Sequence, residues 1–180
     1  MTQLEFSFLN KTKSFQGLFH SLFIYKNGRL LYRFAPKSLG GSRNRNVEAG
    51  SILSGYKKVH VKKKAYSVHL IVFAMHHGDV VFEKLKDGLV IDHIDGNKLN
   101  NKIENLRLCT RSENAKNSKA KRKRALPKGV YKNRWRGFVA IISSGGKRLE
   151  KTFLSIEEAV SWRNWMGKKL HGEFFRGDYQ

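Results

Sequence analysis

Residues 90–119, VIDHIDGNKLNNKIENLRLCTRSENAKNSK, are the stretch that decides the fold. Apolar residues at 89–93 and again at 106–109 indicate two short strands. An Asn-rich loop that opens with an Asp95-Gly96 turn separates them. A helix is then expected to begin near Thr110 or Ser112, because Thr110 and Glu113 have the spacing of a capping box. The predicted order is strand, loop, strand and helix.

Asp92 and His93 are neighbours on the first of these strands, so their side chains point to opposite faces. Hydrolysis of a phosphodiester requires a base that deprotonates water and a hard cation that polarises the phosphate. One residue can hold the metal while the other reaches the water, if strand twist or a bulge lets both approach one phosphate. Asn114, in the first turn of the expected helix, can complete an oxygen-rich site of the kind that Mg²⁺ prefers.

These residues resemble the HNH homing endonucleases of phage and bacterial mobile introns, whose ββα-metal motif supplies a His, a central Asn and a third His or Asn. The resemblance implies that His93 is the general base and that Asp92 and Asn114 bind a divalent metal. It makes Asn105 the brace of the loop that orients the His93 ring. Asparagine at the third position weakens a zinc assignment and favours Mg²⁺ or Mn²⁺.

The resemblance extends upstream to about residue 22, through Gly55-Tyr56 and the His-Leu-Ile-Val of residues 69–72. Relatives often have His followed by Arg-Leu at the latter position, and Leu70 departs from that pattern. We therefore assign His69 no catalytic role and expect the histidines outside the motif to be surface or packing residues. The simpler alternative for the motif itself is an ordinary Asn-rich turn with a hydrogen-bonded Asp-His pair.

The charge of the chain narrows the class of partner. Its 180 residues contain 36 Lys and Arg against 14 Asp and Glu, a formal charge of +22. A surplus of this size favours a polyanion, with nucleic acid as the first candidate and an anionic membrane as the second, and gives no reason to expect a small-molecule substrate. Hydrophobic residues make up 40% of the chain, which excludes disorder throughout.

One cysteine, Cys109, excludes an intrachain disulfide and a thiolate zinc cluster, and is expected to be a small buried hydrophobe in a reducing cytosol. The N-terminal residues lack the order of a secretory signal, and the longest apolar run, residues 70–75, is too short to cross a bilayer. We expect a cytoplasmic protein of a bacterium or a phage-infected host cell, neither secreted nor membrane-bound.

The chain is predicted to be organised in four parts. Residues 1–55 form a β-rich segment with a hairpin around Asn27-Gly28, and residues 56–115 form the HNH nuclease domain, in which a second hairpin at residues 59–70 leads into a helix up to Gly78. Residues 116–127 form a basic linker, because no acidic residue occurs between Glu113 and Glu150 while twelve Lys and Arg do.

The fourth part, residues 128–176, is expected to hold three antiparallel strands at residues 129–132, 137–143 and 147–153, followed by a helix that Ser155 and Glu158 cap. The whole chain is thus predicted to be α+β. In their order, Gly129-Val130-Tyr131, Trp135-Arg136-Gly137-Phe138 and residues 170–174 (Leu-His-Gly-Glu-Phe) resemble the APETALA-type (ethylene-response-factor) DNA-binding domain. That family places such a sheet in the DNA major groove.

Basic and aromatic residues of the linker and the sheet are therefore the predicted DNA contacts. They are Lys121, Arg122, Lys123, Arg124, Lys132, Arg134, Trp135, Arg136, Lys147 and Arg148. The linker residues are expected to lie along phosphates. For Trp135, DNA contact and packing are both open, whereas Trp162 and Trp165 are expected in the core.

The sequence thus predicts a metal-dependent HNH endonuclease that binds double-stranded DNA and makes a nick or a double-strand break, with a homing role implied by the resemblance. One HNH unit in the chain favours a monomer over a dimer and a nick as the simpler product. A non-catalytic DNA-binding regulator with a degenerate nuclease site is the alternative. An RNA-binding or ribosome-associated protein would fit the charge, but it would leave Asp92, His93, Asn105 and Asn114 unexplained.

Overall fold

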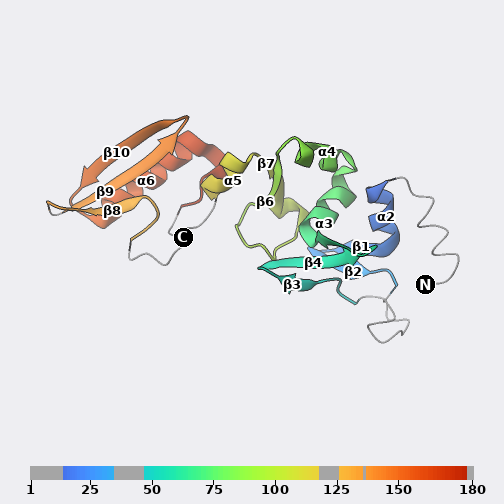
Figure 1. Cartoon of the computed structure of the whole chain (residues 1–180). Helices are drawn as coiled ribbons and strands as arrows, with labels where there is room; N and C mark the ends of the chain where they lie inside the picture. The colour runs from blue at the N-terminus through green and yellow to red at the C-terminus, as the bar shows by residue number, and fades with distance from the viewer. Residues whose placement is uncertain (1–13, 35–46, 118–125, 136, 178–180) are drawn as a thin grey trace. The chain divides into compact units, whose positions relative to one another are not determined.

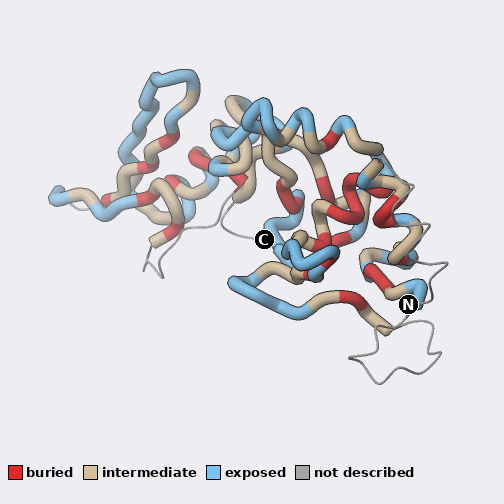
Figure 2. The backbone as a smooth tube through the Cα atoms, turned by 45° about the vertical axis from the view of Figure 1, so that its right-hand side comes forward, coloured by how far each residue is buried: buried red, intermediate tan, exposed pale blue. Residues whose placement is uncertain are grey.

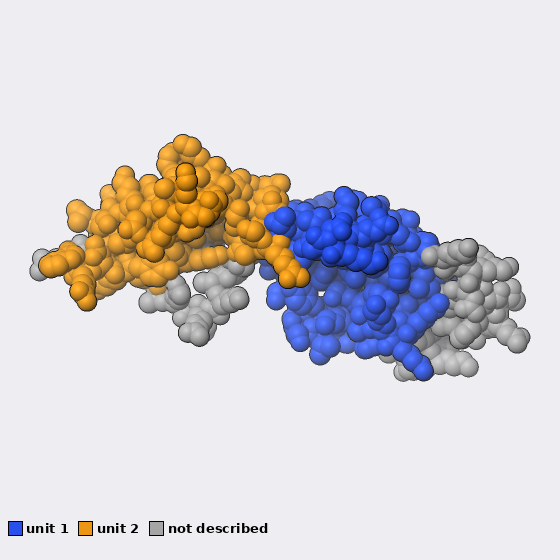
Figure 3. Space-filling model, turned by 45° about the horizontal axis from the view of Figure 1, so that its top comes forward, with its two compact units in different colours: residues 1–110 blue, residues 111–180 orange. Residues whose placement is uncertain are grey.

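The computed structural model describes residues 14–34, 47–117, 126–135 and 137–177. The chain divides into two compact units, residues 1–110 and residues 111–180, which are coloured separately in Figure 3. Both combine helices with small antiparallel sheets, so the α+β class predicted from the sequence is confirmed (Figure 1). No helix within the described ranges has an apolar stretch long enough to cross a membrane.

The described part of the first unit begins with a helix that the sequence did not predict. Helix α2 (Phe15–Leu22) starts at Ser14, whose hydroxyl accepts a hydrogen bond from the Gly17 N–H over 3.1 Å. Strands β1 (Phe23–Lys26) and β2 (Arg29–Tyr32) follow as the predicted antiparallel hairpin. Asn27 and Gly28 form its turn with φ values of 47° and 80°, the left-handed conformation that a tight hairpin needs.

A second sheet has the strand order β3 (Ser51–Leu53), β4 (Tyr56–Val61) and β5 (Lys64–Ser67). The hairpin predicted at residues 59–70 is too long, because β5 ends at Ser67 and α3 (Val68–His77) begins at once. Val68, Ile71 and Val72 are all buried, and their helical spacing prevails over the apparent alternation with Leu70. Helix α4 (Val80–Lys86) follows after Gly78 and was not predicted.

The strand, loop and strand predicted from residues 90–109 are present. Strand β6 (Val90–His93) pairs antiparallel with β7 (Leu106–Cys109), and the 3-10 helix η2 (Ile103–Asn105) leads into β7. Asp92 lies directly opposite Arg107, and His93 lies opposite Leu106. This register fixes which side chains of the two strands can meet.

One hydrophobic core joins the N-terminal residues to the rest of the first unit. Phe19 and Phe23 are fully buried in the same cluster as Val59 and Ile71, and Leu106 of β7 reaches it as well. Figure 2 colours the buried residues along the backbone red. The boundary predicted at residue 55 therefore falls inside one packed unit, since the β1–β2 hairpin and α2 share their core with the nuclease residues.

The second unit consists of a three-stranded sheet packed on one long helix. Its elements are α5 (Arg111–Asn117), β8 (Val130–Asn133), β9 (Gly137–Ser144), β10 (Lys147–Phe153), α6 (Ile156–His171) and the 3-10 helix η3 (Gly172–Phe174). The sheet order is β8-β9-β10, and Val130, Ala140 and Ala159 form the buried centre. The Ser155 hydroxyl accepts a hydrogen bond from the Glu158 N–H over 3.1 Å, as the capping pattern predicted.

Two expectations for this unit need correction. Lys116 and Asn117 belong to α5, so the helix extends into the first residues predicted as linker, and residues 118–125 lie outside the described part of the chain. Trp162 packs on Phe153 with ring centroids 5.9 Å apart, as predicted. Trp165, which was expected in the core, is 58% exposed because it lies on the outer side of α6.

Candidate active site

Strand β6 ends in the two residues that the sequence singled out. Asp92 is 5% exposed and His93 is 4% exposed, so both are buried although they are polar. Buried polar groups are stable only when other groups satisfy them. The partners of Asp92 and His93 therefore define the site.

Arg107, directly across from Asp92 on β7, is the partner of its carboxylate. The Arg107 Nε and Nη2 atoms lie 3.2 and 3.1 Å from the same oxygen, Oδ2 of Asp92. Only 12% of the Arg107 side chain and 6% of the Asp92 side chain are exposed. Asp92 is thus held in a fixed place by a buried ion pair, and the sequence analysis did not single out Arg107.

His93 forms a hydrogen bond at Nε2 and lies beside the rings of His69 and Tyr56. Its Nε2 lies 3.2 Å from Oδ1 of Asn101. The ring of His69 stands edge-on to it with centroids 5.0 Å apart, and the Tyr56 ring lies at 6.3 Å. We call Tyr56, His69 and His93 the histidine cluster.

His69 was given no role from the sequence, yet the fold places it against His93. It lies in the first turn of α3, and its ring centroid is 5.5 Å from that of Tyr56. Burial, and secondarily the positive charge that His93 can carry, lower the pKa of His69 to about 4, so this imidazole is neutral at pH 7. The sequence feature that pointed to His69 was the His-Leu-Ile-Val stretch of residues 69–72. His69 was assigned no catalytic role because Leu70 departs from the family pattern there.

Asn105 closes the loop between β6 and β7. Its Oδ1 accepts a hydrogen bond from the Asp95 N–H over 3.0 Å, while its Nδ2 donates to Oδ1 of Asp95 and to the Asn100 carbonyl, both over 2.9 Å. The Asn105 carbonyl accepts a further bond from the Ile94 N–H over 2.9 Å. Asn105 therefore contacts the loop, and Asn101, which lies within that loop, contacts the His93 ring.

Asp95 is the acceptor around which this loop is built. Besides Asn105, it receives hydrogen bonds from the Asn97 N–H over 2.8 Å and from Nδ2 of Asn100 over 2.7 Å. Burial is the largest single influence on the pKa of Asp95 and raises it, but the three sets of hydrogen bonds, with the charge of His93, together bring it below its ordinary value. The carboxylate is thus an internal structural anchor of the loop.

Asn114, the remaining residue of the predicted site, lies half-buried on α5. This helix belongs to the second unit, whereas Asp92, His93 and Asn105 belong to the first. The fold thus brings three of the four predicted residues into one local structure. The place of Asn114 in a shared metal site stays a prediction.

The donor chemistry at the end of β6 fits a hard cation. Mg²⁺ is commonly bound by one or two carboxylates, with water and substrate phosphate in its other positions, and Asp92 supplies one carboxylate. Within the described ranges, no group of three or more His, Cys, Asp or Glu side chains is arranged to hold a metal ion. An ion at Asp92 would share that carboxylate with Arg107.

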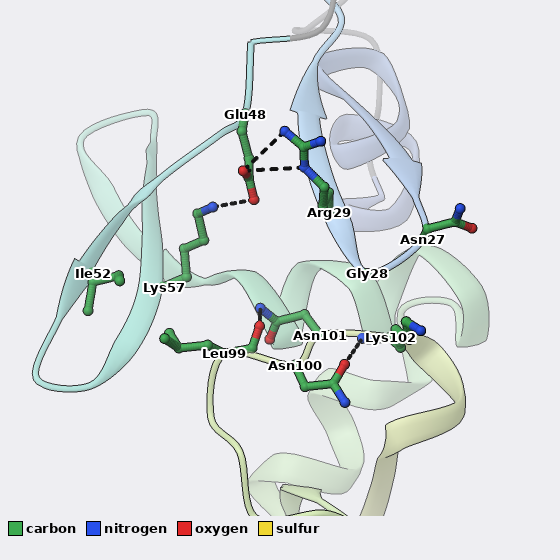
Figure 4. Close-up of a pocket in the computed structure, with 10 residues that line it drawn as sticks. All are labelled: Asn27, Gly28, Arg29, Glu48, Ile52, Lys57, Leu99, Asn100, Asn101 and Lys102. Carbon is green, nitrogen blue, oxygen red and sulfur yellow. Dashed lines mark hydrogen bonds and ion pairs between the residues drawn. The ribbon is translucent and has the colours of Figure 1, made fainter.

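A pocket of about 230 Å³ lies beside the loop that holds His93 (Figure 4). Its lining comes from the β1–β2 turn, the β3–β4 hairpin and the loop: Asn27, Gly28, Arg29, Glu48, Ile52, Lys57, Leu99, Asn100, Asn101 and Lys102. Glu48 pairs with Lys57 and with Arg29, the latter over 3.3 Å. The hydrogen bond from Lys57, with the charges of both cations, outweighs burial and lowers the pKa of Glu48.

The predicted DNA contacts in the second unit do not share one face of the sheet. Residues opposite each other in antiparallel strands point to the same side, and Phe138 and Ala140 point toward the core under α6. Lys132 lies opposite Phe138, and Lys147 lies opposite Ser144, so both are on the α6 side. Arg148 is on the open face, where Glu150 pairs with it over 2.8 Å.

Two further predicted contacts, Arg134 and Trp135, lie in the β8–β9 turn and are exposed. Trp135 is 85% exposed, so it does not pack in the core of this unit. Tyr131, Asn133 and Ile141, which alternate with the core residues, share the open face with Arg148. The linker residues 121–124 and Arg136 lie outside the described residues.

Comparisons with known proteins bear on this site. A family model described as HNH endonuclease matches residues 66–116, which include the histidines of the cluster and β6, β7 and most of α5. Protein 3.8 of Escherichia phage T7 is 35% identical over 94 residues, which cover 49% of this chain and 75% of that protein. An uncharacterised HNH endonuclease of Acanthamoeba polyphaga mimivirus is 30% identical over 95 residues, 53% of this chain.

The chain spans half the length of the mimivirus protein and three quarters of the phage protein. No solved structure matches the chain. The HNH match and the site at the end of β6 coincide in the sequence, since residues 66–116 contain Asp92, His93, Asn105 and Asn114. The chain therefore belongs to the HNH endonuclease family, and residues 66–116 are its HNH endonuclease domain.

Proposed function

We propose that this protein is a metal-dependent endonuclease that hydrolyses phosphodiester bonds in double-stranded DNA, with His93 as the general base. The observation that carries the proposal is the position of His93, buried at the end of β6 and held by Asn101 and His69 beside the Asp92–Arg107 ion pair. A base acts efficiently only when its ring is held in one orientation within reach of its proton donor.

The hydrogen bonds of Asn101 indicate which nitrogen of His93 would act. The Asn101 Nδ2 donates to the Leu99 carbonyl over 3.2 Å, so the amide oxygen, Oδ1, is the atom that faces Nε2 of His93. Nε2 must then carry the ring proton and donate it to Asn101. A neutral imidazole has one protonated nitrogen, which leaves Nδ1 as the basic atom that takes the proton from water.

His69 supports this role without taking part in proton transfer. Its ring is neutral at pH 7 and stands edge-on to His93, so it fixes the His93 ring without placing a second positive charge there. Tyr56 packs against both rings, and the Lys98 ammonium lies 4.4 Å from the centre of the Tyr56 ring. We infer that the histidine cluster limits the orientations open to the base.

In the proposed site, Asp92 and Asn114 would hold Mg²⁺ or Mn²⁺, as the resemblance to HNH homing endonucleases implies. When bound, the ion supplies positive charge to the scissile phosphate and to the leaving oxygen. Arg107 holds the Asp92 carboxylate in place, and a cation bound there would share that carboxylate with Arg107.

We further propose that the second unit directs the enzyme to DNA in the manner of an APETALA-type domain. Support comes from its sheet-on-helix architecture and from the exposed Arg134 and Trp135 in the β8–β9 turn. Linker residues 121–124 would add phosphate contacts. A monomer with one active site would nick one strand, and a homing role is part of the same proposal.

Supercoiled plasmid incubated with the protein and Mg²⁺ tests the function directly. Conversion to nicked circles is expected, and both EDTA and the His93→Ala variant should abolish it while DNA binding in a gel-shift assay persists. Cleavage that survives both changes would exclude the proposed mechanism. A mobility shift without any cleavage by the unmodified protein would instead support the non-catalytic regulator.

A further inference from the structure

The turn between β4 and β5 contains two lysines in an unfavourable backbone conformation. Lys62 and Lys63 have φ values of 47° and 65°, and Val61 pairs with Lys64 on either side of them. A two-residue hairpin turn with both φ values positive strongly prefers Asn-Gly, Asp-Gly or Gly-Gly, because a side chain with a Cβ is strained there. A hairpin with lysine at both positions is therefore less stable than the same hairpin with one of these favoured pairs.

Each of the other tight hairpin turns in the described residues has glycine in at least one of its two positions. The β1–β2 turn is Asn27-Gly28, and the β9–β10 turn is Gly145-Gly146, both with positive φ values. The β3–β4 turn is Ser54-Gly55. The β4–β5 turn is thus the one two-residue hairpin turn in the described residues without glycine. Strained backbone of this kind is typical of functional positions, which indicates a function for the two lysines.

Charge and exposure indicate what that function is. Lys62, Lys63 and Lys64 are all exposed at the end of the hairpin. No acidic residue occurs from residue 49 to residue 78, and Glu48, just before this segment, is already paired with Arg29 and Lys57. The tip of the hairpin therefore carries three consecutive exposed lysines, and an anion is the complementary partner.

The same hairpin leads to the proposed active site. Strand β4, labelled in Figure 1, begins at Tyr56. The Tyr56 ring contacts those of His69 and His93. Six residues of extended strand separate Tyr56 from Lys62, a span of about 20 Å at about 3.3 Å per residue. Successive nucleotides of one DNA strand rise about 3.4 Å, so this span equals roughly six base pairs.

We propose that Lys62 and Lys63, the lysine turn, are a phosphate-binding site of the first unit that contacts the backbone of duplex DNA about six base pairs from the phosphodiester bond that is cleaved. This inference rests on the proposed DNA endonuclease function and adds a contact outside both the HNH domain and the second unit. The lysines contribute affinity and hold the duplex over the histidine cluster, without reading its sequence.

A double variant separates the functional from the structural role of the turn. Lys62→Asn with Lys63→Gly installs the favoured turn, so the melting temperature should rise while DNA affinity falls. Two lost phosphate contacts should lower the slope of log K against log salt concentration by about 2 and weaken binding at 0.1 M salt on the order of tenfold or more. Fluorescence anisotropy with a labelled 40-base-pair duplex of arbitrary sequence measures both quantities.

A matched control removes the same charge elsewhere on the first unit. Lys84→Gln with Lys86→Gln changes two exposed lysines on α4 and should leave the salt slope as it is. An unchanged slope in the turn variant, or an equal loss in the α4 variant, would overturn the inference. Plasmid nicking by the unmodified protein is scored separately, so a protein that binds through the lysine turn but never cleaves would refute the proposed function alone.

Discussion

The hydroxyl of Tyr25 accepts a hydrogen bond from the backbone N–H of Ile103 over 3.0 Å, which ties β1 to η2 across 78 positions of the chain. The Tyr25 ring also stands edge-on to His76 of α3, with centroids 4.8 Å apart. Tyr25 lies outside the residues that match the HNH endonuclease model. The N-terminal hairpin is thus part of the support of the loop that holds His93.

Replacing Tyr25 with Phe should loosen this loop while the core stays intact. The change removes only the acceptor of the Ile103 N–H, so the free energy of unfolding should fall by about 1 kcal/mol. Hydrogen exchange at the Ile103 amide should accelerate, and plasmid nicking should slow while DNA affinity is kept. Exchange at Ile103 as slow as in the unmodified protein would show that the hydroxyl does not hold the loop.

The buried pair of Asp92 and Arg107 should be far more sensitive to the loss of one partner than an exposed pair. Arg107→Ala would leave the Asp92 carboxylate, 6% exposed, without this guanidinium, and the free energy of unfolding should fall by about 3–5 kcal/mol. Urea denaturation measures the loss. Adding Asp92→Asn to the same variant removes the buried charge and should restore part of the stability.

Arg148→Ala is the matched control for this prediction. Its side chain is 62% exposed and pairs with Glu150, which is 57% exposed, so its loss should cost less than about 1 kcal/mol. Equal costs at Arg107 and Arg148 would mean that burial of the Asp92 pair contributes nothing to its strength.

His69 should make the folded protein sensitive to mild acid. The ordinary pKa of a histidine in the unfolded chain is about 6.5, and the folded value is about 4. Between these values the unfolded state binds the extra proton, so stability should be complete above about pH 6.5 and fall as the pH drops toward 4, by on the order of 3 kcal/mol. Below about pH 4 this contribution should no longer change.

Urea denaturation at a series of pH values tests the assignment to His69. In the His69→Phe variant the fall in stability between pH 6.5 and 4 should be smaller than in the unmodified protein, because the titrating group is gone. The Phe ring keeps an aromatic contact with His93. Parallel pH profiles for the two proteins would assign the acid sensitivity to other groups.

The sequence was sufficient where local chemistry determines the structure. The Asp95-Gly96 turn and the two apolar strands all lie within residues 90–109, and Asn105 contacts the loop between the strands. Short helices such as α4 were missed because seven residues carry little helical signal and depend on tertiary packing.

Residues that meet only through the tertiary fold could not be predicted in the same way. His69 reaches His93 because α3 packs against β4 and η2, and Arg107 reaches Asp92 because the strand register sets them opposite each other. The direction of Lys132 and Lys147 depends on register too, since a shift of one residue exchanges the two faces of a strand. Without the register, the basic residues of the second unit were all predicted to contact DNA from one face of the sheet.

Trp135 provides the most direct test of DNA binding by the second unit. It is 85% exposed in the β8–β9 turn, so Trp135→Ala should leave the free energy of unfolding within about 0.5 kcal/mol of its original value. Anisotropy with duplex DNA should show about tenfold weaker binding, a loss of about 1.4 kcal/mol, if the indole lies against the duplex. Trp165→Ala is the matched control, because Trp165 is also exposed but lies on α6, away from the open face of the sheet. Equal losses for the two tryptophans, or none for Trp135, would contradict the proposal that this sheet contacts DNA.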